Sequence, residues 1–293
     1  IPLPLPTPNW RSLEIRPDLH FGFDIGLKVL FPGNHTTLQI NWERLHASDS
    51  TSTEVSSENM VGPYFNIGPD SHPYKRAHGH VKHGFDEVTL SIGSQFDSCR
   101  GLKINYTGGV AITRIEETLT STFSNNDWTV VRGVYTPTEF IGIGPEFGAD
   151  VSYNLCEGFS LTGESSMALL LGRGRNHTSY ASITPELEVF DIPLPNIQHT
   201  EVPSRTQFVP AFSGKLGVSY TGCFSSCLVT LDLGYQAQIY LNAVQSVEMS
   251  AEVVEPTIIE LPANEVGVFA LGFRRTVSDF FLAGPYVTLK IAF

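Results

Sequence analysis

Histidine side chains gather in one polar stretch of the chain, where their spacing could serve a metal ion. His78 and His80 would share one face of an extended segment, and His72 and His83 lie close to them in the sequence. No Cys, Asp or Glu completes a recognisable ligand set there. We therefore expect solvated histidines, with neither a metal ion nor a cofactor.

Groups that could carry covalent or acid–base catalysis are equally sparse. The sequence has no nucleophile elbow, no phosphate-binding loop and no paired-carboxylate motif. The glycines of the run 172–175 are not followed by a helical pattern, so they do not form a nucleotide-binding loop. The sequence thus predicts a protein that is not an enzyme.

Four cysteines offer redox chemistry. All of them fall in segments that we predict to be short turns on one side of a membrane, where an oxidising compartment would preserve disulfides. One interpretation is local, either as free thiols or as staples that join Cys223 to Cys227 and Cys99 to Cys156. The other is bonding between protein molecules, which would cross-link the cell envelope. The spacings do not match a zinc site.

Charged residues recur at alternate positions of apolar segments. A β-strand sends successive side chains to opposite faces, so such a segment has one apolar and one polar face. Between residues 19 and 29, the odd positions are all apolar, whereas the even positions are mostly polar or glycine. We expect the polar faces to line a barrel interior of mixed charge, through Asp24, Lys28, Glu43, Glu87, Lys103, Asp150, Glu164, Lys215, Asp232 and Lys290.

The alternating segments are arranged as consecutive hairpins. Short turns separate the two members of each hairpin, and long polar segments separate one hairpin from the next. We predict an all-β fold, a transmembrane antiparallel up-and-down β-barrel of about 8–10 strands with short periplasmic turns and long extracellular loops. The predicted strands run through 17–31, 38–43, 88–96, 102–112, 141–153, 159–171, 208–220, 229–241 and 281–293.

Aromatic residues close the strands just before the short turns and at the end of the sequence. Such residues collect at the interfaces of a membrane, so we expect them to mark the periplasmic rim of the barrel. The alternating end of the sequence also has the pattern that outer-membrane assembly machinery recognises in barrels. The set comprises Phe31, Phe96, Tyr153, Tyr220 and Phe293.

The chain divides into a Pro-rich segment, 1–16, and a barrel domain, 17–293. Four prolines in the first segment would each remove a ladder donor, so this segment cannot easily supply a strand. Bacterial barrels normally have an even number of strands, and we therefore expect one more strand upstream of Ile1. The extracellular loops are expected at 47–81, 117–138, 174–206 and 245–278.

Composition limits the alternatives. The chain has 293 residues, of which 41% are hydrophobic and 16% are charged. No segment comes near the 18 or so uninterrupted apolar residues of a transmembrane helix, and no secretory leader is recognisable at Ile1. The net charge of -12 argues against a nucleic-acid partner, because phosphates require a basic patch.

Two stretches and the C-terminal end also resemble a known family. They are PDLHFGFDIGLKVLFPGNHTTLQINWERLHASDS, IGPEFGADVSYNLCEGFSLTGESSMALLLGRG and the ending GPYVTLKIAF. These runs are similar to the Legionella-type major outer membrane proteins. The resemblance implies an abundant, porin-like surface protein of the bacterial outer membrane without enzymatic activity, and it supplies no catalytic residue.

Three kinds of function fit these observations. The first is a structural, porin-like barrel with small-solute passage through a narrow polar lumen, although about eight to ten strands leave an interior largely filled by side chains. The second is a surface-loop adhesin or host-interaction protein with the barrel as its anchor. The third is a soluble secreted β-sandwich or lipocalin-like binder. The expected partners are outer-membrane lipid or lipopolysaccharide, the assembly machinery, further copies of the chain linked by disulfides or non-covalently, and host surface molecules.

Overall fold

The computed structural model describes residues 14–16, 18–31, 35–54, 75–97, 101–124, 131–156, 158–183, 196–224, 227–252 and 270–292. No helix among these residues is long and apolar enough to cross a membrane. They form nine strands: β1 (Gly22–Phe31), β2 (Thr36–Glu54), β3 (Arg76–Asp97), β4 (Leu102–Ser124), β5 (Val131–Cys156), β6 (Phe159–Ile183), β7 (Asn196–Phe224), β8 (Cys227–Glu252) and β9 (Ala270–Ala292).

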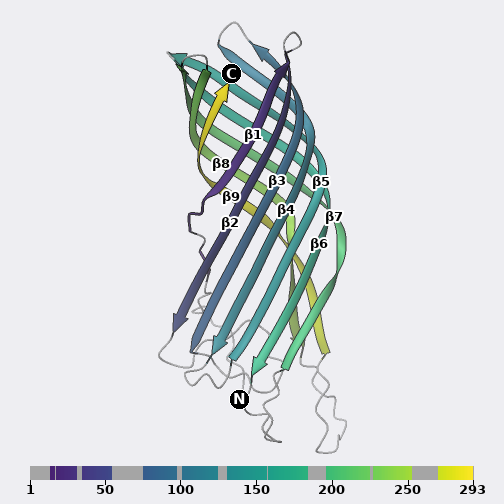
Figure 1. Cartoon of the computed structure of the whole chain (residues 1–293). Coiled ribbons are helices and arrows are strands. Elements are labelled where there is room, and N and C mark those ends of the chain that lie inside the picture. The colour runs from purple at the N-terminus through teal and green to yellow at the C-terminus, as the bar shows by residue number, and fades with distance from the viewer. Residues whose placement is uncertain are drawn as a thin grey trace, which may run out of the picture.

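The nine strands form a single sheet in which every strand pairs with its neighbour in the sequence. All of the pairs are antiparallel. The sheet rolls into a tall cylinder, with the short turns at one end and the long connections at the other (Figure 1). This confirms the predicted all-β, up-and-down arrangement. Backbone pairing between β1 and β9, which would close the barrel, is not found among the described residues.

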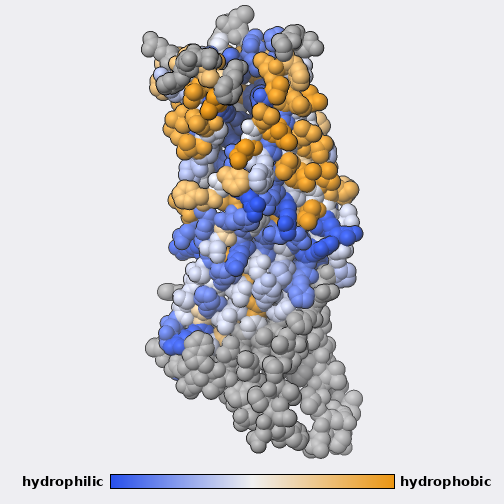
Figure 2. All heavy atoms as spheres, in the orientation of Figure 1, coloured by the Kyte–Doolittle hydropathy of each residue, from blue (hydrophilic) through white to orange (hydrophobic). Residues whose placement is uncertain are grey.

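The outward face of the sheet carries a broad apolar band near the short-turn end (Figure 2). Register explains the band, because residues opposite each other on antiparallel strands point to the same face. One such row joins Trp42, Val88, Ile112 and Ile143 on four successive strands. From Ile141 to Tyr153, at ~3.3 Å per residue and a tilt of about 45°, the band spans roughly 28 Å. That height matches the hydrocarbon core of a membrane.

The strands continue well beyond the apolar band. β2 extends to Glu54 and β3 begins at Arg76, so both enter the segment 47–81 that the sequence predicts to be a loop. The same correction applies to the predicted loops 117–138, 174–206 and 245–278, which strands β4 to β9 enter from both sides. Outside the membrane a strand no longer needs an apolar face, so the alternation ends before the strand does. The remaining parts of these loops lie outside the described residues.

Strand β8 bends sharply and crosses the inside of the cylinder. Its pairing with β9 shifts register between Tyr240 and Val244, and Asn242 has a φ of 58°. Such a bulge redirects a strand, and Asn tolerates the left-handed conformation better than most residues. Beyond the bend, the carbonyl oxygen of Gln245 accepts hydrogen bonds from Thr138 Oγ1 at 2.8 Å and Asn176 Nδ2 at 2.5 Å. The bend thus presses β8 against the inner face of β5 and β6.

The segment before β1 is described from residue 14, except for residue 17. It is not part of a strand, and the first strand begins at Gly22 rather than near 17. The backbone N–H of Asp18 donates to Asp49 Oδ1 at 3.0 Å, and His20 Nε2 lies 2.8 Å from the same oxygen. This segment is therefore tied to β2. The rest of the Pro-rich segment lies outside the described residues.

Candidate functional site: the barrel interior

Ion pairs cross the interior at the level of the apolar band. Lys215 Nζ on β7 donates to Asp24 Oδ2 on β1 at 3.0 Å. Lys28 Nζ on β1 lies 3.9 Å from Asp150 Oδ2 on β5. These pairs join strands that are not neighbours in the sheet, so they hold its two halves together across the lumen.

A second group links β9 to β6 and β8. Lys290 Nζ lies 3.4 Å from Glu164 Oε1 and 3.5 Å from Asp232 Oδ2. Asp232 is almost fully buried and also accepts hydrogen bonds from Thr162 Oγ1 and from the hydroxyl of Tyr286. A buried carboxylate requires such partners because an unpaired charge is costly away from water. This part of the interior is polar, with its charges largely paired.

Further along the interior, two carboxylates lie next to a layer of apolar side chains. Glu43 accepts a hydrogen bond from Gln238 Nε2 at 2.7 Å. Glu87 accepts hydrogen bonds from Thr113 Oγ1 at 2.6 Å and from the hydroxyl of Tyr240 at 2.8 Å. Tyr240 thus contacts the polar zone through its hydroxyl group and the apolar layer through its ring.

That layer, which we call the interior apolar cluster, fills the lumen where β8 bends inward. The ring centroid of Phe85 lies 5.5 Å from that of Tyr240 and 6.1 Å from that of Phe280. The Phe140 ring lies over Gly142 and Gly172, where an added Cβ would come within 2.6 Å of ring atoms. The cluster comprises Phe85, Ala111, Ile115, Phe140, Leu170, Val209, Ala211, Tyr240, Ala243, Val244 and Phe280.

All ten charged residues predicted to line the lumen are on described strands. Seven are joined in ion pairs: Asp24, Lys28, Asp150, Glu164, Lys215, Asp232 and Lys290. Glu43 and Glu87 are hydrogen-bonded, and Lys103 has no ion pair among the described residues. That these residues line an open pore stays a prediction. Uncharged partners such as Gln238 and Tyr240 are missing from the sequence-based set, which considered charged residues alone.

A family comparison agrees with this architecture. The model of the family described as Legionella pneumophila major outer membrane protein precursor matches residues 4–293. The chain belongs to the Legionella major outer membrane protein family. Membership in this family confirms the resemblance and places the protein in the bacterial outer membrane. Comparison with curated proteins and with solved structures gave no match.

The matched family is one of major outer membrane proteins and is not an enzyme family. The outward apolar band of the chain faces lipid in this location. In other outer-membrane barrels the short turns are periplasmic and the long connections extracellular, and we expect the same orientation here.

The aromatic residues predicted to mark the periplasmic rim lie beside the short turns. Phe31, Phe96, Tyr153 and Tyr220 are all exposed at the ends of their strands. Tyr220 contacts Phe159 across the β6–β7 pair, with ring centroids 4.9 Å apart. The fifth member, Phe293, lies outside the described residues, and its part in assembly stays a prediction.

The cysteines lie at the same end. Cys156 and Cys223 are exposed free thiols. The β7–β8 register places Cys223 opposite Leu228, and it places Phe224 opposite Cys227. Because adjacent residues of a strand point to opposite faces, Cys223 and Cys227 lie on different sides of the sheet and do not form the suggested staple. No disulfide is found among the described residues, and Cys99 lies outside them.

His78, His80 and His83 lie on β3, in the described part of the chain. No group of three or more His, Cys, Asp or Glu side chains there is arranged to hold an ion. His78 and His80 alternate along β3 as expected, and His83 Nδ1 lies 3.3 Å from Glu117 Oε2. His72 lies outside the described residues.

Proposed function

We propose that the protein is a structural, porin-like component of the outer membrane with a gated lumen. In this proposal small solutes pass only when the interior apolar cluster opens. The observation that carries it is the change of character along the interior, from paired charges to packed aromatic and aliphatic side chains. A polar interior supports solute passage, whereas the apolar cluster supports a closed resting state.

Charge pairing in the polar zone supports low selectivity. Lys215, Lys28 and Lys290 are each matched by carboxylates, and the six carboxylates and four lysines predicted to line the interior leave only a small acidic excess. A lumen of mixed sign would favour small neutral or zwitterionic solutes over strongly charged ones. Strong selectivity usually requires a ring of one charge sign.

Single-channel recording in planar bilayers tests the gate. Phe280 is 4% exposed inside the cluster, whereas its neighbour Phe281 is 61% exposed on the outer face. We expect rare openings from the wild-type protein, more frequent or larger openings from Phe280→Ala, and wild-type behaviour from the matched control Phe281→Ala. Phe280→Val serves as a milder variant, and the heat-dependent gel mobility of all variants verifies that they fold.

Two results would overturn the gated lumen. A wild-type barrel that stays open at high conductance would show that the cluster does not close it. If the folded Phe280→Ala variant shows no more channel openings than the wild type, the protein has a purely structural role.

A second candidate, presentation of surface loops, is favoured by the long extracellular strand extensions. β2 continues from Trp42, in the apolar band, to Glu54, which adds about 40 Å of strand at ~3.3 Å per residue. Replacing 55–74 by a short linker should leave channel behaviour unchanged and reduce attachment to host cells. Unchanged attachment would count against this loop as an adhesive surface.

A further inference from the structure

A ring of charged side chains follows directly after the apolar band on the outward face. The register row that contains Trp42, Val88 and Ile112 is followed two residues later by a row with Arg44, Asp86 and Arg114. We define the charged ring as Arg44, Lys82, Asp86, Arg114, Glu116, Glu139, Arg173 and Arg175. In Figure 2 hydrophilic residues lie next to the apolar band at this level.

Pairing within the charged ring leaves part of its positive charge unmatched. Arg44 Nε lies 3.5 Å from Asp86 Oδ1, and Arg114 pairs with both Glu116 and Glu139. These contacts occupy the three carboxylates of the ring. The ring contains five cationic and three anionic side chains, although the whole chain has a net charge of -12. This set of side chains therefore has an excess of two cationic groups.

Arg173 and Arg175 lie two residues apart on β6, and both are exposed without an ion pair among the described residues. Glu139 lies opposite Arg175 in the register, but its Oε1 is 3.1 Å from the guanidinium of Arg114. The two arginines point to the same side of the sheet, about 7 Å apart along the strand. Leu169 and Leu171 precede them on the same face and belong to the apolar band.

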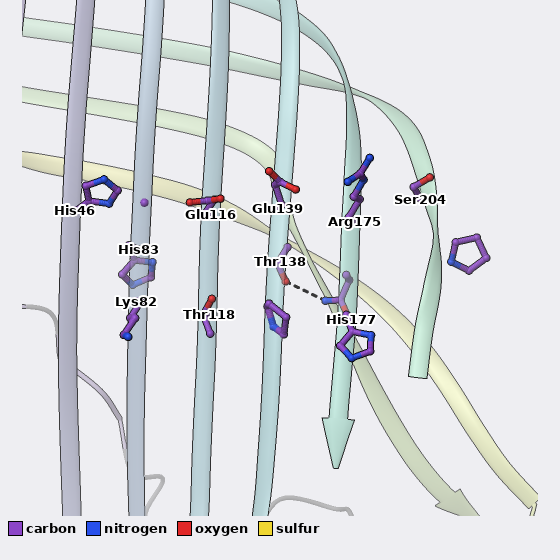
Figure 3. Close-up of a pocket in the computed structure, with 14 residues that line it drawn as sticks. His46, Lys82, His83, Glu116, Thr118, Thr138, Glu139, Arg175, His177 and Ser204 are labelled. Carbon is purple, nitrogen blue, oxygen red and sulfur yellow. Dashed lines mark hydrogen bonds between the residues drawn. The ribbon is translucent and has the colours of Figure 1, made fainter. Parts of the chain in front are cut away.

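A hollow of about 770 Å³ lies along the charged ring (Figure 3). Gly84 lies between His46 and Glu116 in the register, and the side chains of these two neighbours cover it. Its lining includes Lys82, Glu116, Thr118, Glu139, Arg175 and Ser204. The hydroxyl groups of Thr118 and Ser204 add hydrogen-bond donors to the cationic groups.

We propose that Arg173 and Arg175, with the adjoining hollow, bind the phosphate groups of a phosphorylated lipid headgroup in the outer leaflet. The guanidinium group matches phosphate oxygens through paired hydrogen bonds. The acyl chains of the same lipid would lie along Leu169 and Leu171. Continuity with the lipid-facing band selects a lipid over a free anion, because one molecule then contacts both surfaces.

Lipid retention by the full chain tests this site. The folded protein is incorporated in phosphatidylcholine vesicles with or without a bisphosphorylated lipid A, washed in detergent, and analysed for bound lipid by mass spectrometry. The double variant Arg173→Gln with Arg175→Gln should bind lipid A about thirtyfold more weakly, because each basic side chain near an anionic lipid surface contributes measurably. Heat-dependent gel mobility confirms that the variant is folded.

A matched control removes the same amount of charge elsewhere. Lys75 precedes β3 and Arg76, which pairs with Glu54, is its first residue; both lie beyond the charged ring, so Lys75→Gln with Arg76→Gln should retain lipid A as the wild type does. Equal retention by the Arg173/Arg175 variant and the wild type would overturn the site. Displacement of lipid A by millimolar inorganic phosphate, which lacks acyl chains, would overturn the commitment to a lipid.

Discussion

Asp49, a carboxyl group outside the membrane band, makes the stability of the fold depend on pH. The Asp18 N–H and the His20 ring contact its Oδ1 atom, while its Oδ2 atom is buried without a hydrogen-bond partner among the described residues. The hydrogen bond from Asp18 lowers the pKa of Asp49; burial opposes this effect, and the contact with His20 adds to it. The charged form is therefore stabilised in the folded protein.

We predict an acid-dependent loss of stability at this site. A carboxyl group with a lowered pKa stabilises the fold above its unfolded pKa, about 3.9, and this contribution disappears as the pH falls through the folded pKa. Urea unfolding in detergent between pH 5 and pH 2 should show a steeper loss for wild type than for Asp49→Asn. Parallel pH profiles for the two proteins would contradict the prediction.

A substitution at Leu233 tests whether the outward face of β8 contacts lipid. It is 49% exposed on the lipid-facing side of β8. Replacing Leu233 with Arg should lower the free energy of unfolding by about 2–4 kcal/mol, because a charge near mid-membrane is costly. Leu233→Ala, which adds no charge, is the control and should cost clearly less. Equal effects of the two changes would place Leu233 away from lipid.

At the level of single residues, alternation predicts which face a side chain occupies but not its partner. Lys28 and Asp150 follow the expected parity, yet their contact depends on how far the sheet rolls. The relation between Cys223 and Cys227 depends on the exact register of one turn, which a spacing of four residues does not reveal. Long-range register is set by packing, and no single segment encodes it.

Among the elements, β8 departs most from its sequence pattern. The strand predicted at 229–241 is regular, but β8 continues past it, bends at Asn242 and packs against the inside of the cylinder beyond the bend. The sequence offers one signal, a series of glycines on the inner face of β5 and β6. At Gly174 an added Cβ would lie 2.6 Å from the Gln245 amide nitrogen. Small residues there permit the close approach of β8.

Gly172 provides a test of the tight packing between β5 and β6. An added Cβ would clash with the backbone oxygen of Ile141, so Gly172→Ala requires the backbone to move. We expect a loss of about 1–3 kcal/mol in the free energy of unfolding, as for other overpacked interiors. At Gly284 on β9 an added Cβ would meet no described atom within 4 Å, so Gly284→Ala should have little effect. Urea titrations in one detergent compare the two, and equal stability would contradict the tight packing.

For the whole molecule, the cysteines report the orientation in the membrane. Cys156 and Cys223 are exposed at the end that carries the short turns, and we expect that end to face the periplasm. An impermeant thiol reagent should label neither residue in reduced, intact cells and should label both after the outer membrane is opened. Strong labelling of intact cells would reverse the orientation. Non-reducing gels of the same samples would show whether disulfides join separate copies of the chain.

The edges of β1 and β9, which lack a ladder partner among the described residues, have a consequence for the dynamics of the molecule. The girth of the cylinder is held by side-chain contacts such as those of Lys215 with Asp24 and Gln238 with Glu43. A backbone amide with no ladder partner exchanges its hydrogen with solvent more readily than one inside a sheet. Deuterium should therefore enter β1 and β9 first and β4 to β6 last. Thermal opening of this barrel would then start along the seam between β1 and β9.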